Sequence, residues 1–136
     1  MKYLLDTSAC IALINGTPAT VRSRFQKVAA GGEVYASSIV TFELWYGVAK
    51  SARPALNAQR LETFLSGPVI ELPFDDEDAR VAGSIRAALE VSGKPIGAYD
   101  LLIAGQALAR QLTLVTANVS EFSRVKGLSW QDWAKP

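Results

Sequence analysis

Four carboxylates stand inside or beside apolar segments, where an unpaired acid is costly to bury. They are Asp6, Glu43, Asp100 and Glu121. Asp6 ends one apolar run, Asp100 opens another, and Glu43 lies among aromatic and aliphatic neighbours. We therefore expect the four acids, which come from distant parts of the chain, to share a cation in one cleft.

The donor types narrow the identity of that cation. The chain has no histidine and a single cysteine, Cys10, which excludes Ser-His-Asp catalysis, Cys-His catalysis and ordinary zinc sites. Hard oxygen ligands suit Mg²⁺ or Mn²⁺, which bind through a few carboxylates and keep several waters. One ion could suffice, or two could stand ~4 Å apart. This equipment fits hydrolysis of a phosphodiester without a protein nucleophile.

Each acid has an expected role. Asp6 and Asp100 would be the main metal ligands, Glu43 would bind or orient a water on the metal, and Glu121 would complete the acidic pocket. With the metal absent, repulsion should raise the pKa of at least one of these acids. Hydroxyl and amide side chains near them in the sequence would support the carboxylates by hydrogen bonds: Thr7, Ser8, Thr116 and Asn118.

Simpler interpretations remain open for individual residues. Asp6 could only end a strand and cap a helix, and Asp100 could only complement a helix dipole. Glu121 could equally be a solvated surface acid. A glutamate inside a helix among aromatic residues is harder to explain in this way, so we favour a functional role for Glu43. The acidic run 75–78 is interpreted as a helix start and not as a metal site.

Strand and helix signals alternate along the chain, which predicts one α/β domain over residues 1–136. Its sheet would be mostly parallel, with helices on both faces. In such sheets the active crevice lies beyond the carboxyl ends of the strands, where strand order reverses. Strands are expected at 3–5, 34–36, 69–72, 112–115 and 128–130, and helices at 8–14, 19–30, 39–50, 54–65, from the run 75–78 to Gly93, and 98–110.

The overall charge gives little attraction for nucleic acid. Fourteen basic and thirteen acidic residues leave a net charge of +1, so any contact with a polyanion must come from a local patch. Arg80, Arg86 and Lys94 are weak candidates for such contacts. We expect a cytoplasmic protein without a membrane span, because Asp6 interrupts the first apolar run and no stretch is long enough to cross a bilayer.

Four segments together resemble the ordered motifs of the PIN-domain ribonucleases, and most closely those of VapC-type toxins. The segments are 4–8, 42–47, 95–104 and 114–122, and the resemblance extends over nearly the whole chain. It implies a PIN-like fold and an Mg²⁺- or Mn²⁺-dependent endoribonuclease toxin. It also implies RNA as substrate, a cognate VapB-like antitoxin that blocks the site, and a homodimer.

The acidic residues follow the family pattern with small departures. Asp6, Glu43 and Asp100 match three acidic positions of the family. Many members carry an aspartate where this chain has Asn118, whereas a subgroup has asparagine there and an acid three residues later, which matches Glu121. Ala117 and Ser8 each replace a common asparagine, and neither change removes a carboxylate.

Two other functions remain possible for a chain with these acids. A phosphatase or phosphotransfer domain would use Asp6 as nucleophile, but such enzymes want a second aspartate where this chain has Ser8. A catalytically silent binding module could keep the same fold.

The antitoxin would fill a groove if the helices around Leu13, Trp45, Tyr46 and Leu61 leave one, with a basic side chain reaching the acids.

Overall fold

A five-stranded sheet forms the centre of the molecule in the computed structural model, which describes residues 1–135. Its strand order is β3-β2-β1-β4-β5, and all four pairings are parallel. The strands are β1 (Lys2–Leu5), β2 (Glu33–Ser37), β3 (Ile70–Leu72), β4 (Thr113–Val115) and β5 (Trp130–Gln131). The predicted parallel α/β sheet is confirmed. Only the last strand lies later than expected, at 130–131 instead of 128–130.

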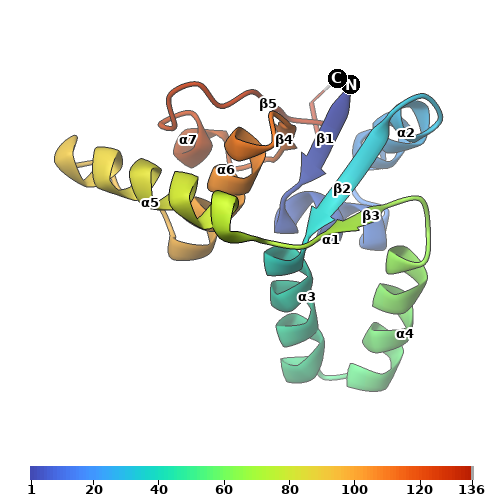
Figure 1. Ribbon diagram of the computed structural model, residues 1–136. Helices are drawn as coiled ribbons and strands as arrows, with labels where there is room; N and C mark the ends of the chain where they lie inside the picture. Colours follow the sequence, from blue (N-terminus) through green and yellow to red (C-terminus); the bar gives the residue numbers. More distant parts are fainter. Residues whose placement is uncertain (136) are drawn as a thin grey trace.

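Seven helices connect these strands. They are α1 (Thr7–Asn15), α2 (Ala19–Ala29), α3 (Ser38–Lys50), α4 (Pro54–Leu65), α5 (Asp76–Val91), α6 (Ala98–Ala109) and α7 (Val119–Phe122). Right-handed crossovers in this strand order put the α1 to α4 connections on one face and α5 to α7 on the other. Figure 1 shows α5, α6 and α7 gathered on one side, and the α3 and α4 pair standing beyond the sheet. The sequence missed α7 because one helical turn leaves no periodic signal.

The strand order reverses at β1. From β1 the chain builds outward through β2 to β3, and then it returns to the other side of β1 to add β4 and β5. The carboxyl ends of β1 and β4 are therefore neighbours at the switch point of the sheet. There the Asp6 amide donates to the Val115 carbonyl at 3.0 Å. Asp6 therefore lies beside Thr116, which directly follows β4, at the edge of the sheet where a parallel fold is expected to bind its ligand.

Side-chain caps start three of the helices. Asp6 caps α1 by accepting a hydrogen bond from the Ala9 amide. Ser37 caps α3 by accepting a hydrogen bond from the Ile39 amide. Asp75 caps α5 and forms a reciprocal capping box with Asp78, which confirms the acidic run as a helix start.

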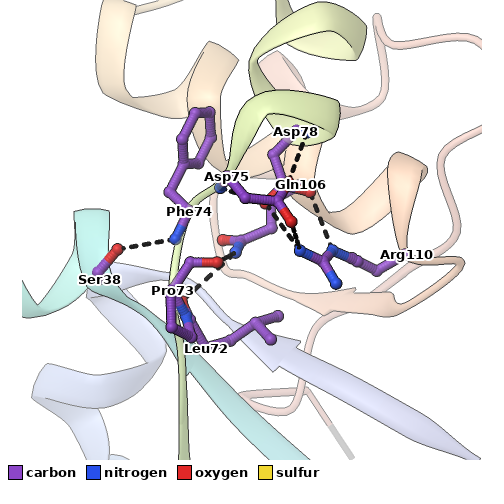
Figure 2. A network of polar contacts seen from close by, with 8 residues as sticks. All are labelled: Ser38, Leu72, Pro73, Phe74, Asp75, Asp78, Gln106 and Arg110. Carbon is purple, nitrogen blue, oxygen red and sulfur yellow. Dashed lines mark hydrogen bonds and ion pairs between the residues drawn. The ribbon is translucent and has the colours of Figure 1, made fainter.

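A polar network ties α6 to the start of α5, as Figure 2 shows. Arg110, just after α6, donates from Nε to Oδ1 of the fully buried Asp78 at 3.0 Å and also bonds Asp75. The Gln106 side-chain amide donates to the Pro73 carbonyl at 3.1 Å. A Cβ on Gly105 would lie 2.5 Å from the Ala82 Cβ, so α5 and α6 can pack this closely only with glycine there. These contacts hold the helix that carries Asp100.

The core lies on both faces of the sheet. Leu4, Ile103, Leu114 and Phe122 have no exposed surface, and Trp133 is 2% exposed, so it packs with them in the core. Trp130, in contrast, is 38% exposed. Within residues 1–135 no helix is both long and apolar enough to span a membrane.

Candidate active site

Asp6 lies at the carboxyl end of β1 and is only 4% exposed. Its Oδ1 accepts hydrogen bonds from the Ala9 amide and the Ser8 hydroxyl, both at 2.8 Å. Burial raises the pKa of Asp6, and the negative charge of Glu43 raises it further against the hydrogen bonds from Thr116, Ala9 and Ser8. Helix capping does not require a carboxylate to be buried near another acid. The environment of Asp6 therefore indicates more than a cap.

Glu43 lies in the second turn of α3, half-buried. Its Oε1 accepts a hydrogen bond from the Thr7 hydroxyl at 2.8 Å. Thr7 opens α1 directly after Asp6, so this bond joins the two helices that follow β1 and β2. The expected supporting role of Thr7 is thus seen as a direct contact with an expected site acid.

Asp100 and Glu121 are held together by Asn118. The Asn118 side-chain amide donates to Glu121 Oε2 at 3.0 Å and, over a longer 3.4 Å, to Asp100 Oδ2. The backbone N–H of Asn118 in turn donates to the Thr116 hydroxyl at 2.8 Å. Asp100 comes from the first turn of α6 and Glu121 from α7, so a short helix brings the fourth acid to the site.

Asp100 is the acid on which the other three act. Burial raises the pKa of Asp100 to about 7, together with a hydrogen bond to Glu121 and the negative charges of Glu121, Asp6 and Glu43. The same hydrogen bond from Asp100 lowers the pKa of Glu121. The two carboxyl groups therefore share a proton near neutral pH, as repelling carboxylates do when no cation separates them.

No arginine or lysine in residues 1–135 forms an ion pair with any of the four acids. The acids are nevertheless spread out: over the same residues, no three carboxylate, histidine or cysteine side chains are close enough to hold one ion jointly. Asp6, Glu43 and Asp100 therefore have no basic partner among these residues, and, as they stand, at most two of the four acids could touch the same cation.

Two features of the site were not found from the sequence. Arg124 lies close enough to Glu121 for its charge to lower the pKa of that acid, and its guanidinium donates to the Pro95 carbonyl at 2.9 Å. The Gly97 amide also bonds Glu121. In the sequence, the position of Arg124 three residues after Glu121 was the signal that could have indicated this proximity.

The basic residues suggested by the sequence lie elsewhere. Arg80 pairs with Asp76 and Glu77 at 3.8 Å, and Arg86 pairs with Glu90 at 3.1 Å, all along the exposed face of α5. These two arginines therefore belong to a solvated helix face. Lys94 is exposed in the loop that leads to α6.

A groove of about 280 Å³ begins beside Glu43 and runs between α1, α3 and α4. It is lined by Ile11, Ile14, Asn15, Glu43, Leu44, Gly47, Val48, Asn57, Arg60 and Leu61. The groove expected from the sequence thus exists and includes Leu61. Leu13 instead lies in the core, and Trp45 and Tyr46 do not line the groove.

Comparison with known proteins agrees with this architecture. The model of the PIN domain family matches residues 3–128. The tRNA(fMet)-specific endonuclease VapC of Shigella flexneri is 42% identical over 134 residues, which cover 98% of this chain and 99% of that protein. Ribonuclease VapC2 of Rickettsia felis is 39% identical over 135 residues, 99% of this chain and 100% of the relative.

Solved structures give the same result. One of them is the crystal structure of VapBC2 from Rickettsia felis bound to a DNA fragment from its promoter. A chain of that structure superposes with a TM-score of 0.91 and is 37% identical, and the match covers 96% of this chain and 98% of that one. DNA-bound VapBC from Salmonella typhimurium gives 0.90 at 40% identity, with 98% of each chain covered. This chain belongs to the PIN-domain family and, within it, to the VapC-type toxins.

Proposed function

We propose that this protein is a metal-dependent endoribonuclease toxin that hydrolyses RNA phosphodiesters and is inhibited by a cognate antitoxin. The observation that carries the proposal is that Asp100, near the switch point of a parallel sheet, feels the negative charges of Glu121, Asp6 and Glu43, while none of the four acids forms an ion pair with an arginine or lysine of residues 1–135. The ribonuclease and endonuclease names of relatives that match nearly the full chain support it.

Mg²⁺ or Mn²⁺ is the cofactor that fits these residues best. The donors are oxygens, and the raised pKa of Asp100 reports negative charge that a cation would neutralise. Because no three acids are jointly within reach of one ion, the fit is to a cation that keeps several waters and takes few protein ligands. When bound, such an ion would lower the pKa of a water and stabilise charge on the phosphate.

We assign a separate role in this reaction to each side chain of the site. Asp6 and Asp100 would hold the cation, and Glu43, fixed by Thr7, would orient a water toward the phosphate. Asn118 keeps Asp100 and Glu121 side by side, so that Glu121 completes the acidic pocket. Ser8 and Thr116 hold Asp6 in place, which preserves the geometry when the charge in the cleft changes.

The groove between α1, α3 and α4 is the proposed antitoxin site. Half of its ten lining residues are aliphatic, which suits the apolar face of an amphipathic partner helix, and Glu43 gives it an acidic side chain that a basic residue of the partner could reach. The solved VapBC complexes support a VapB-like partner. A homodimer that acts in the cytoplasm, where RNA is available, completes the proposal.

The test is cleavage of labelled RNA by the purified protein. We expect cutting in Mg²⁺ or Mn²⁺, none in excess chelator, recovery when the metal is returned, and inhibition by the copurified antitoxin. Undiminished cutting in chelator would refute the metal mechanism. Phosphate trapped covalently on Asp6 would instead support a phosphatase, and absence of any turnover with correctly folded protein would support a silent binding module.

A further inference from the structure

Two exposed aromatic side chains each directly precede a site acid in the sequence. Phe42 is 53% exposed and Tyr99 is 46% exposed, whereas the aromatic residues of the core, Phe122 and Trp133, are 0% and 2% exposed. The ring centroids of Phe42 and Tyr99 lie 5.6 Å apart, and the ring planes are tilted by 59°. The pair is thus an ordered aromatic contact at the surface and not a part of the core.

The position of the pair connects it to the site. Phe42 directly precedes Glu43 on α3, and Tyr99 directly precedes Asp100 on α6. The contact between the two rings therefore bridges the two helices that supply these carboxylates. Because the planes are strongly tilted, the rings do not stack face to face, and ring surface stays open to a third planar group.

The charge of the site explains why such a surface is useful. A cleft of four acids repels the phosphates of an incoming strand, and a bound cation compensates only the phosphate beside it. The net charge of +1 adds little long-range attraction. Binding of the flanking nucleotides therefore needs contacts that do not depend on charge, and stacking of bases on aromatic rings is such a contact.

We propose that Phe42 and Tyr99 form a stacking platform for an unpaired base next to the cleaved phosphate, which makes them substrate-positioning residues. The inference rests on the proposed ribonuclease function. It also implies a preference for single-stranded or looped RNA, because a base inside a duplex has no free face for the platform.

The experiment uses the full-length variants Phe42→Leu and Tyr99→Leu, which keep an apolar side chain and remove the ring. With an unstructured labelled RNA whose cut position has been mapped, we expect each variant to raise KM about tenfold with kcat within about twofold. Tyr99→Phe should behave as the parent. Tyr46→Leu is the matched control, because Tyr46 is 59% exposed one turn further along α3 and does not line the antitoxin groove.

A substrate with an abasic nucleotide beside the cut position identifies the partner of the rings. It should raise KM for the parent protein as much as the leucine variants do, and the two changes should not add. Binding of a fluorescein-labelled adenine oligoribonucleotide to the Asp100→Asn protein, followed by anisotropy, measures the same loss without turnover.

Other outcomes overturn the platform. Unchanged KM and binding in both leucine variants contradict it, as does full additivity with the abasic substrate. Conversion of a dimer to monomer in Phe42→Leu, Tyr99→Leu and also Tyr46→Leu, seen by light scattering, would assign the pair to a contact between two copies. These results are distinguishable from failure of the proposed function, in which the parent protein itself does not cut RNA while the binding assay still reports on the rings.

Discussion

The molecule contains two clusters of acids with opposite electrostatics. In the cluster at the start of α5, Asp75 bonds the Asp78 amide and Arg110 pairs with both acids, and these contacts lower the pKa of Asp75. In the cleft, burial and three neighbouring acids raise the pKa of Asp100 to about 7. In the first cluster the fold supplies an arginine to the acids. In the second, Asp100 faces three other acids and forms no ion pair within residues 1–135, which is what a cation-binding site requires.

The strongest test of this difference is the loss of catalysis in the cleft. Asp100→Asn removes a proposed metal ligand and should lower RNA cleavage on the order of 10³-fold or more, because a cation contributes several kcal/mol to the transition state. Asp76→Asn, which removes an equal charge from the exposed face of α5, is the matched control and should keep full activity. Steady-state cleavage assays measure both, and an active Asp100→Asn enzyme would contradict the assignment.

The structural cluster should respond in stability instead. Asp78→Asn removes the buried carboxylate that receives Arg110 and bonds the Asp75 amide, so it should lower the free energy of unfolding by about 3 kcal/mol. Urea unfolding measures the change. Cleavage by the folded fraction should remain within a few-fold of the parent. A variant as stable as the parent would show that the ion pair adds nothing to the fold.

Smaller effects are expected from the residues that hold the carboxylates. Asn118→Ala frees Asp100 and Glu121, and Thr7→Val frees Glu43. Each should lower kcat about 10- to 100-fold, as for other outer contacts of metal ligands, without unfolding the protein. Thr63→Val serves as a control, because the Thr63 hydroxyl bonds only an exposed carbonyl of its own helix. Full activity in both site variants would remove Asn118 and Thr7 from the site.

The pH dependence of stability gives the smallest and most specific signal. Folding raises the pKa of Asp100 from its ordinary value of 3.8 to about 7, so between these values the folded state binds more protons than the unfolded state. In chelator, stability should therefore fall as the pH rises from about 4 to 7. The loss at pH 8 should be about 2 kcal/mol after allowance for partial exposure.

Two comparisons check that assignment by thermal unfolding. Asp100→Asn should flatten the pH dependence and be more stable than the parent at pH 8 in chelator, and Mg²⁺ should stabilise the parent more than this variant. Asp76→Asn, which removes one charge from the exposed face of α5, is the matched control. A parent protein whose stability is flat between pH 5 and 8 would contradict the crowding of charge in the cleft.

Features that depend on a few adjacent residues were predictable from the sequence. The acidic run 75–78 was predicted as a helix start because a helix start is determined by a few adjacent residues. Asp6, Glu43 and Asp100 stood out because each interrupts an apolar stretch. In contrast, α7 has one turn and no periodicity, so the element that delivers Glu121 to Asp100 was not predicted.

Contacts between distant segments were beyond the reach of those signals. The groove at Glu43 was expected, yet Leu13 turned inward and Trp45 and Tyr46 lie outside its lining, because the rotation of α3 is set by packing against its neighbours. The pairing of Phe42 with Tyr99 likewise depends on the docking of α3 against α6.

By itself, the sequence determined the donor chemistry and the alternation of strands and helices, because residue types and short-range periodicity are properties of the chain. Tertiary structure decided which acids lie beside a basic side chain and which lie beside other acids. Asp78 and Asp100 are both acids near the start of a helix, and only the position of Arg110 beside one of them makes the first structural and leaves the second available to a cation.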